Sequence, residues 1–191
     1  SGAIIKATSR VGEDDKFDLM LVIAGGDPVS FRDVKVFQWL RTLARRGVRL
    51  GGVSGGPVIL AYAGLMKGRR MTVHWEHALA LSEISPRLMI ERTLFVIDRD
   101  RLTCAGGTAP LDMMHALLAE NHGSAFAREV SDWFLHTEIR SSEGPQRAGL
   151  VERYGTTSPP IIQAIETMEN HVADPLELGQ LAELSDVSRR Q

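Results

Sequence analysis

The sequence predicts an α/β fold in which a mainly parallel sheet is sandwiched by helices. Two observations predict it. Continuous apolar segments alternate with amphipathic segments, and the junctions between them carry paired glycines. A continuous apolar run is typical of a strand buried on both faces, and strands that alternate with helices of roughly 10–15 residues form parallel sheets covered on both sides. A shorter all-α region is expected after this body.

The elements of the body follow from its apolar periodicity. Leu19–Ala24 is a continuous apolar run and is expected to be a strand. Ser30, with Asp33 three residues later, resembles a capping box, so a helix is expected from there to Gly47. Then follow a strand at 48–53, a helix at 57–66, a hairpin of 93–97 and 101–105, a helix from Thr108 or Ala109 to about Gly123, and a helix from 124 to 136. The helix opened by Pro110 is expected to turn Leu111, Met114, Leu117 and Leu118 inward.

The C-terminal part is expected to form a separate, incomplete domain. Residues 1–136 form the body, and 137–155, which contain Gly, Pro and Ser without a sustained period, are interpreted as a linker. Residues 156–191 predict two short helices, beginning at Ser158 and at Asp174 with Pro175. Two short helices do not bury a core of their own, so this region is interpreted as a truncated domain. The body opens abruptly, and a first α/β repeat is expected upstream of Ser1.

Composition limits the function classes. The chain has 191 residues, 43% of them apolar, and a net charge of −2, which argues against disorder and against a protein that coats nucleic acid. No apolar run is long enough to span a bilayer. Cys104 is the only cysteine, so an intrachain disulfide is impossible and a reducing, cytoplasmic setting is expected. The stretch from Thr156 onward has six acidic and two basic residues, net −4, and is not expected to hold DNA unaided.

The candidate site lies where the predicted strands end. Glycines follow three strands, in segments 24–28, 51–57 and 104–110, and each segment leads into a helix. Open α/β sheets bind ligands beyond the carboxyl ends of their strands, and helix N-termini attract carboxylates. The alternative is that the glycines only make tight turns. The residues expected to contact a ligand are Gly25, Gly26, Ser54, Gly55, His74, Trp75 and Thr108.

Ser54 also has a possible catalytic interpretation. It lies within Gly52–Gly56, which fits the G-x-S-x-G nucleophile elbow, and His74 is the candidate base. Alternatively, His74 and His77 are surface or capping histidines and Trp75 packs in the core. A metal site at these histidines with Glu76 lacks a convincing third ligand, so no metal and no cofactor are expected. Cys104 is expected to be a packed thiol.

A larger set of segments resembles the ThiJ/PfpI class of glutamine-amidotransferase-like domains, in the GlxA-like branch that is joined to an AraC-type DNA-binding domain. The matching segments are Gly51–Arg69, Thr72–Trp75 and Leu102–Asp112, and Leu176–Arg190 resembles the start of an AraC-type helix-turn-helix. The resemblance implies a flavodoxin-like fold. It places Ser188, Arg189 and Arg190 at the start of a recognition helix for DNA. Ser54 stands where the enzymes of this class have a cysteine.

Because a serine is far less nucleophilic than a thiolate, this departure favours a ligand sensor over an enzyme. The leading hypothesis is a homodimeric, ligand-responsive transcription regulator that binds operator DNA only as the intact protein. The run from Ala105 to Met114 most resembles regulators of arginine, carnitine or glycine-betaine catabolism. Trp75 would suit a quaternary ammonium group. The runner-up is a Ser54/His74 hydrolase or amidase, and a non-catalytic assembly domain is the third hypothesis.

Overall fold

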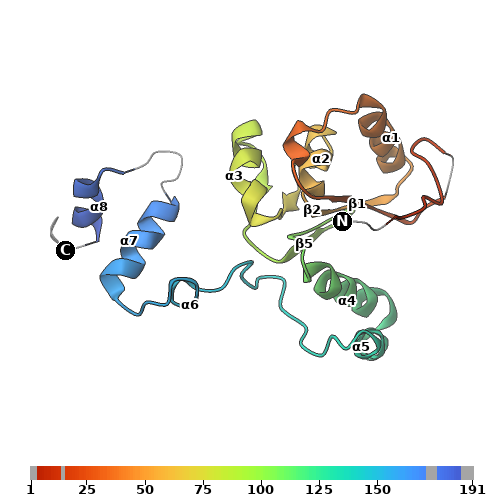
Figure 1. The fold of residues 1–191 in the computed structure, drawn as a ribbon. Helices are drawn as coiled ribbons and strands as arrows, with labels where there is room; N and C mark the ends of the chain where they lie inside the picture. Colours follow the sequence, from red (N-terminus) through yellow and green to blue (C-terminus); the bar gives the residue numbers. More distant parts are fainter. Residues whose placement is uncertain (1–3, 14–15, 171–175, 186–191) are drawn as a thin grey trace. The chain divides into compact units, whose positions relative to one another are not determined.

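The computed structural model describes residues 4–13, 16–170 and 176–185 of the chain. It divides into two compact units, residues 1–146 and 147–191 (Figure 1). The division falls inside the segment that the sequence predicts as a linker, and each unit is described by itself below. Among the described helices, none is both long and apolar enough to cross a membrane.

The first unit contains the predicted mainly parallel sheet. Its strands are β1 (Leu19–Ala24), β2 (Arg49–Ser54), β5 (Phe95–Asp98) and β6 (Arg101–Cys104), in the spatial order β1-β2-β6-β5. β1, β2 and β6 are parallel, whereas β5 runs antiparallel to β6 in the predicted hairpin. In this register Ala24 pairs with Ser54, and Val53 pairs with Cys104. The three glycine-rich junctions therefore leave the sheet at the same edge.

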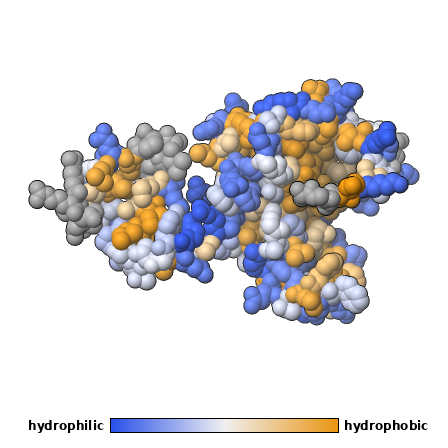
Figure 2. Space-filling model, viewed as in Figure 1, coloured by the Kyte–Doolittle hydropathy of each residue, from blue (hydrophilic) through white to orange (hydrophobic). Residues whose placement is uncertain are grey.

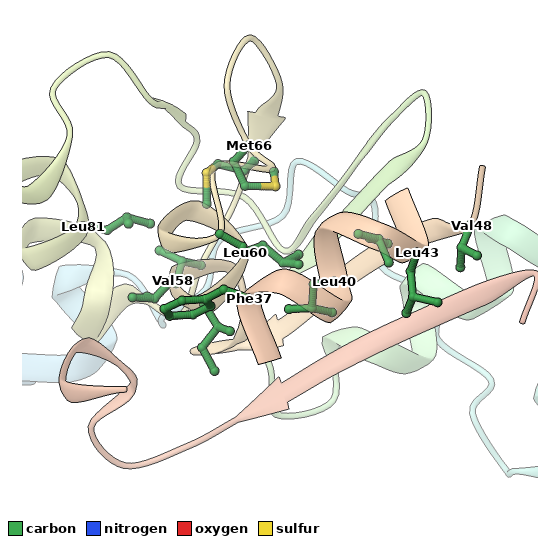
Figure 3. Close-up of a cluster of buried hydrophobic side chains, with 13 residues drawn as sticks. Phe37, Leu40, Leu43, Val48, Val58, Leu60, Met66 and Leu81 are labelled. Carbon is green, nitrogen blue, oxygen red and sulfur yellow. The ribbon is translucent and has the colours of Figure 1, made fainter. Parts of the chain in front are cut away.

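One face of the sheet is covered by α1 (Val34–Arg45) and α2 (Gly56–Tyr62), with α3 (Trp75–Ile84) beside them (Figure 1). The predicted helix start at Ser30 is wrong. Asp33 caps α1 instead, because its carboxylate accepts from the backbone N–H groups of Lys35 and Val36, while Ser30 ends the short 3₁₀ helix η1 (Pro28–Ser30). Figure 3 shows the core on this face, to which α1 and α2 contribute Phe37, Leu40, Leu43, Val58 and Leu60.

The opposite face is covered by α4 (Ala109–His122), which packs in turn against α5 (Ser124–Trp133) (Figure 1). The predicted inward face of α4 is wrong in part: Leu111 is 39% exposed, whereas Asp112 is completely buried. The edge strand β1 is less covered on this side, and Ile23 is 73% exposed. Apolar side chains also reach the surface in the first turn of α5, at Phe126, and around its C-terminal end, at Trp133, Phe134 and Leu135 (Figure 2).

Besides η1, the sequence prediction lacks α3 and the two strands β3 (Arg70–Met71) and β4 (Met89–Ile90), which pair in parallel. Two-residue strands are too short to give a period of alternating side chains. In α3, only Leu81 is fully buried, so no apolar stripe marks the helix.

The described part of the second unit is helical, as predicted, with α7 (Pro159–Asn170) and α8 (Leu178–Leu184). It also contains a helix that was not predicted, α6 (Leu150–Tyr154), which lies inside the segment interpreted as a linker. The carboxylate of Glu169 in α7 accepts from Tyr154 in α6 at 3.2 Å and also pairs with Arg153. A capping box of Glu177 and Gln180 starts α8. The predicted start at Asp174–Pro175 lies outside the described residues, as do Ser188, Arg189 and Arg190.

Candidate functional site

Ser54 ends strand β2 in a backbone conformation that few serines adopt. Its φ is +59°, in the left-handed region, and α2 begins two residues later. Such a conformation costs of order 1–3 kcal/mol and persists only where the surroundings impose it. Two backbone hydrogen bonds hold Ser54 in this conformation. Gly55 N–H donates to the Ala24 carbonyl at 2.9 Å, and His74 N–H donates to the Ser54 carbonyl at 3.2 Å. The structure thus has the sharp strand-to-helix turn that the G-x-S-x-G pattern predicts.

Glycine backbone packs directly against this turn. A Cβ on Gly106, whose own φ is +89°, would lie 2.7 Å from Ser54 Cβ. A Cβ on Gly55 would lie 2.6 Å from Pro28 Cγ, and one on Gly56 would lie 1.9 Å from the Val22 carbonyl oxygen. The three glycine-rich junctions therefore come together around Ser54.

Gly25 and Gly26 lie on the outer side of this arrangement. Both are exposed, and a Cβ on either would meet no atom within 4 Å. Gly26 has a φ of +65°, which accounts for a glycine there. Their backbone is therefore open to solvent beside the end of β1.

His74, Trp75 and His77 surround the start of α3, next to Ser54. His74 is the N-cap residue, and its Nδ1 accepts from the Glu76 N–H at 3.4 Å, so the neutral ring carries its proton on Nε2. Trp75 is 43% exposed, and its ring centroid lies 5.4 Å from that of His74. The His77 ring lies 5.9 Å from His74; burial lowers the pKa of His77, and the neighbouring His74 lowers it further.

The structure places Ser54 and His74 next to each other without forming a catalytic pair. Their contact is through the backbone, and among the described residues no hydrogen bond joins the Ser54 hydroxyl to the His74 ring. The Glu76 carboxylate lies 3.5 Å from His74 Nδ1, beyond ordinary hydrogen-bond length. A serine nucleophile needs a hydrogen-bonded base that is itself held by a third group. That relay is not assembled here.

Cys104 lies beneath this site and is not a nucleophile. The side chain is completely buried at the end of β6, as the sequence predicts. Burial raises the pKa of its thiol to about 11, although the backbone N–H groups of Gly106 and Ser54 oppose the rise. The thiol therefore remains protonated at neutral pH.

The described residues also contain no group of three His, Cys, Asp or Glu side chains that could hold a metal ion.

Thr108 contacts an arginine from a distant segment. Its hydroxyl accepts from Arg140 Nη2 at 2.7 Å. The same guanidinium binds the buried Asp112, through Nε at 3.0 Å and Nη2 at 2.6 Å, and the Arg140 backbone N–H donates to Asp112 at 2.9 Å. His136 Nε2 lies 3.0 Å from the same carboxylate. Burial raises the pKa of Asp112, but the hydrogen bonds from Arg140 and His136 outweigh it and hold the pKa below its usual value.

Gln146 contacts the segment that leads into His74. Its side-chain nitrogen lies 2.8 Å from the Thr93 carbonyl, 3.0 Å from the Thr72 hydroxyl and 3.1 Å from the Val73 carbonyl. Sequence reasoning missed this residue and the cluster of Arg140, Asp112 and His136. The available signal was an aspartate that stands between apolar residues in α4, at Asp112.

Comparison with known proteins supports the resemblance stated from the sequence. The model of the DJ-1/PfpI family matches residues 1–120. The chain is 42% identical over all 191 residues to the HTH-type transcriptional regulator GlxA of Rhizobium meliloti, covering 59% of that protein. It is 44% identical over 176 residues, 92% of the chain, to the HTH-type transcriptional regulator CdhR of Pseudomonas aeruginosa, covering 52% of it. The chain therefore spans little more than half the length of these curated relatives.

A solved structure gives the same result. The crystal structure of an AraC family transcriptional regulator from Pseudomonas putida superimposes with a TM-score of 0.55 at 29% identity, covering 61% of this chain and 63% of that one. The predicted fold class and the predicted family are both confirmed. No comparison assigns a ligand to the residues around Ser54.

Proposed function

Because this chain belongs to the DJ-1/PfpI family and its curated relatives are HTH-type transcriptional regulators, we propose that it is part of a ligand-responsive transcription regulator. Residues 1–146 act as the sensor. Residues 147–191, whose described part is helical, belong to the DNA-binding part, and the intact regulator acts on operator DNA as a cytoplasmic homodimer. An effector alters the placement of its two DNA-binding parts.

The effector proposed for the sensor is a small amino compound with a carboxylate and a cationic nitrogen, of the arginine, carnitine or glycine-betaine class. The observation that carries this proposal is the convergence of three strand ends on Ser54, with the exposed backbone of Gly25 and Gly26 on one side. Backbone N–H groups at such strand ends suit a carboxylate. The half-exposed ring of Trp75 offers a π face to the cationic group.

We propose that the site binds its ligand without converting it. Ser54 has no hydrogen bond to the His74 ring among the described residues, and the only cysteine is buried and protonated. The second candidate, a Ser54/His74 hydrolase or amidase, is kept because Ser54 does lie on a strained strand-to-helix turn. Active-site hydrogen bonds can also tighten when substrate binds.

Proton NMR of the 191-residue chain with L-arginine, carnitine, glycine betaine, choline and simple esters separates these functions. Saturation transfer from protein to ligand measures binding, and the same samples followed over hours reveal any product. A sensor gives saturation transfer with an unchanged ligand. Product that disappears in Ser54→Ala would instead identify a hydrolase. Saturation transfer from none of the compounds would contradict the proposed ligand class.

A further inference from the structure

Residues 137–146, here called the strap, follow α5 and form the last ten residues of the first unit. The strap is not a free linker. Hydrogen bonds attach it to the first unit at Arg140, Ser142 and Gln146. Each of these three residues is linked by hydrogen bonds to a residue that lies close in sequence to Gly106 or His74, which both contact Ser54.

The first attachment is Arg140. It holds the hydroxyl of Thr108 and the buried carboxylate of Asp112, both in the first turn of α4 or just before it. Thr108 follows Gly106 by two residues, and Gly106 is the glycine whose backbone packs against the Ser54 side chain. Only Gly107 therefore separates the glycine that packs against Ser54 from the residue that Arg140 holds.

The second attachment is in the middle of the strap. The Ser142 carbonyl accepts from Leu94 N–H at 2.9 Å, and the Leu94 carbonyl accepts from Ala105 N–H at 2.8 Å. Ala105 directly precedes Gly106. The strap is thus hydrogen-bonded, through one intervening residue, to the same glycine-rich junction that Arg140 contacts from the other side.

The third attachment is Gln146, the last residue of the first unit. The carbonyl oxygens of Thr93 and Val73 can only accept, so the Gln146 amide must turn its nitrogen toward them. The peptide group between Val73 and His74 then has a partner at each end. Its oxygen accepts from Gln146 at 3.1 Å, and its N–H donates to the Ser54 carbonyl at 3.2 Å. One rigid peptide plane joins the strap to the strained turn.

We propose that the strap couples the site around Ser54 to the helical unit that begins at Arg147, with Gln146 and Arg140 as its positioning residues. The coupling rests on the proposed function of that site as an effector site. A ligand that shifts the Ser54 turn changes the hydrogen bonds of Gln146 and so the path of the chain into the second unit. By linkage, releasing Gln146 must loosen the site in return.

This reciprocity allows a test in the absence of ligand. Amide hydrogen exchange is measured by NMR on the 191-residue chain for the wild type, for Gln146→Leu and for the control Glu143→Gln, an exposed residue of the same strap. In Gln146→Leu the His74 amide is expected to exchange about tenfold faster, while amides of α1 remain at the rates of the control. An unchanged His74 rate, or an equal rise in α1, would overturn the coupling.

A second test perturbs the site and measures the strap. Gly106→Ala must displace Ser54, whereas Gly47→Ala introduces an alanine at a similar positive φ (+84°) with no atom within 4 Å. Trypsin cleavage after Arg140 is measured relative to cleavage after Arg45 of α1 in the same variant, which reports global unfolding. This ratio is expected to be several-fold higher in Gly106→Ala than in Gly47→Ala, because the strap must detach before it is cut. Equal ratios in the two variants would contradict the proposal.

The two arms use different variants, so failure of one to fold leaves the other decisive. Neither arm needs an effector, which separates this inference from the proposed function. Saturation transfer from none of the effector compounds would count against the proposed ligand class alone. If a ligand binds but the exchange rate of the His74 amide is the same in Gln146→Leu as in the wild type, the sensor function is supported and the strap has no part in its mechanism.

Discussion

The Ser54 side chain occupies space that is free only because Gly106 has no side chain. A Cβ on Gly106 would lie 2.7 Å from Ser54 Cβ and 3.0 Å from Ser54 Oγ. Both residues have positive φ, +89° for Gly106 and +59° for Ser54. Two separate strand ends, each with a residue of positive φ, are therefore in direct contact. Because Ser54 contributes its side chain to this contact and Gly106 only its backbone, one methyl group added at Gly106 would disrupt the contact.

Substitution of Gly106 is expected to destabilise the protein more than substitution of another glycine with positive φ. Gly106→Ala has to move Ser54 and strains its own backbone, and we expect a loss of about 2–3 kcal/mol in the free energy of unfolding. The control Gly47→Ala strains only its backbone and is expected to lose about 1 kcal/mol. Urea denaturation of both variants measures the difference. Equal losses would show that the Gly106–Ser54 contact has no energetic consequence.

Removal of the Asp112 charge is expected to detach the strap. Asp112→Asn keeps the size of the side chain but replaces one acceptor oxygen by a donor, which then faces Arg140 or His136. We expect a loss of about 2 kcal/mol in the free energy of unfolding, since a buried partner is left unpaired. The exposed Asp132 on α5 provides the control, because Asp132→Asn is expected to change stability by less than about 0.5 kcal/mol. Urea denaturation of the two variants decides the matter.

The contribution of the Asp112 carboxylate to the free energy of unfolding is expected to decrease at acidic pH. Its folded-state pKa is lowered, so its contribution to stability is fully present above the unfolded-state pKa, about 3.9, and is lost as pH falls through the lower folded-state value. The stability difference between wild type and Asp112→Asn should therefore be constant near neutral pH and shrink below about pH 4. Chemical denaturation across this range tests it. A difference that grows on acidification would contradict the assigned direction of the pKa.

The Cys104 thiol is expected to be unreactive in the folded protein. It is completely buried, and burial raises its pKa to about 11. A thiol reagent such as 5,5′-dithiobis(2-nitrobenzoate) should therefore label the native chain only at the rate of unfolding, and at once in concentrated denaturant. Rapid labelling of native protein at neutral pH would show that the segment over Cys104 opens.

The α/β body could be predicted from the sequence, whereas the contacts that complete the site could not. Leu19–Ala24 and the hairpin of β5 and β6 were found because buried strands leave apolar runs bounded by turn residues. Ser54 was found because its turn needs glycines at fixed positions. The roles of Asp112 and Gln146 depend on partners 28 and 73 residues away, which no local pattern contains.

Local composition did not reveal how the strap is held. A segment with serine, glycine and proline usually lies on the surface between elements, and residues 137–146 have that composition. What binds the segment to the first unit is three specific hydrogen-bonding groups, at Arg140, Ser142 and Gln146. Hydrogen bonds of this kind leave no apolar period in the sequence, so only the folded arrangement reveals them.

The central claim, that a small carboxylated amino compound binds where three strands end around Ser54, is tested most directly by mapping its binding on the backbone. L-Arginine, carnitine and glycine betaine are titrated separately into ¹⁵N-labelled protein, and the amide shifts are followed. The account predicts saturable shifts for at least one compound at Gly25, Gly26, Gly55, Trp75 and Gly106, with α5 unaffected. No saturable shift with any compound, or shifts confined to residues away from Ser54, would contradict it.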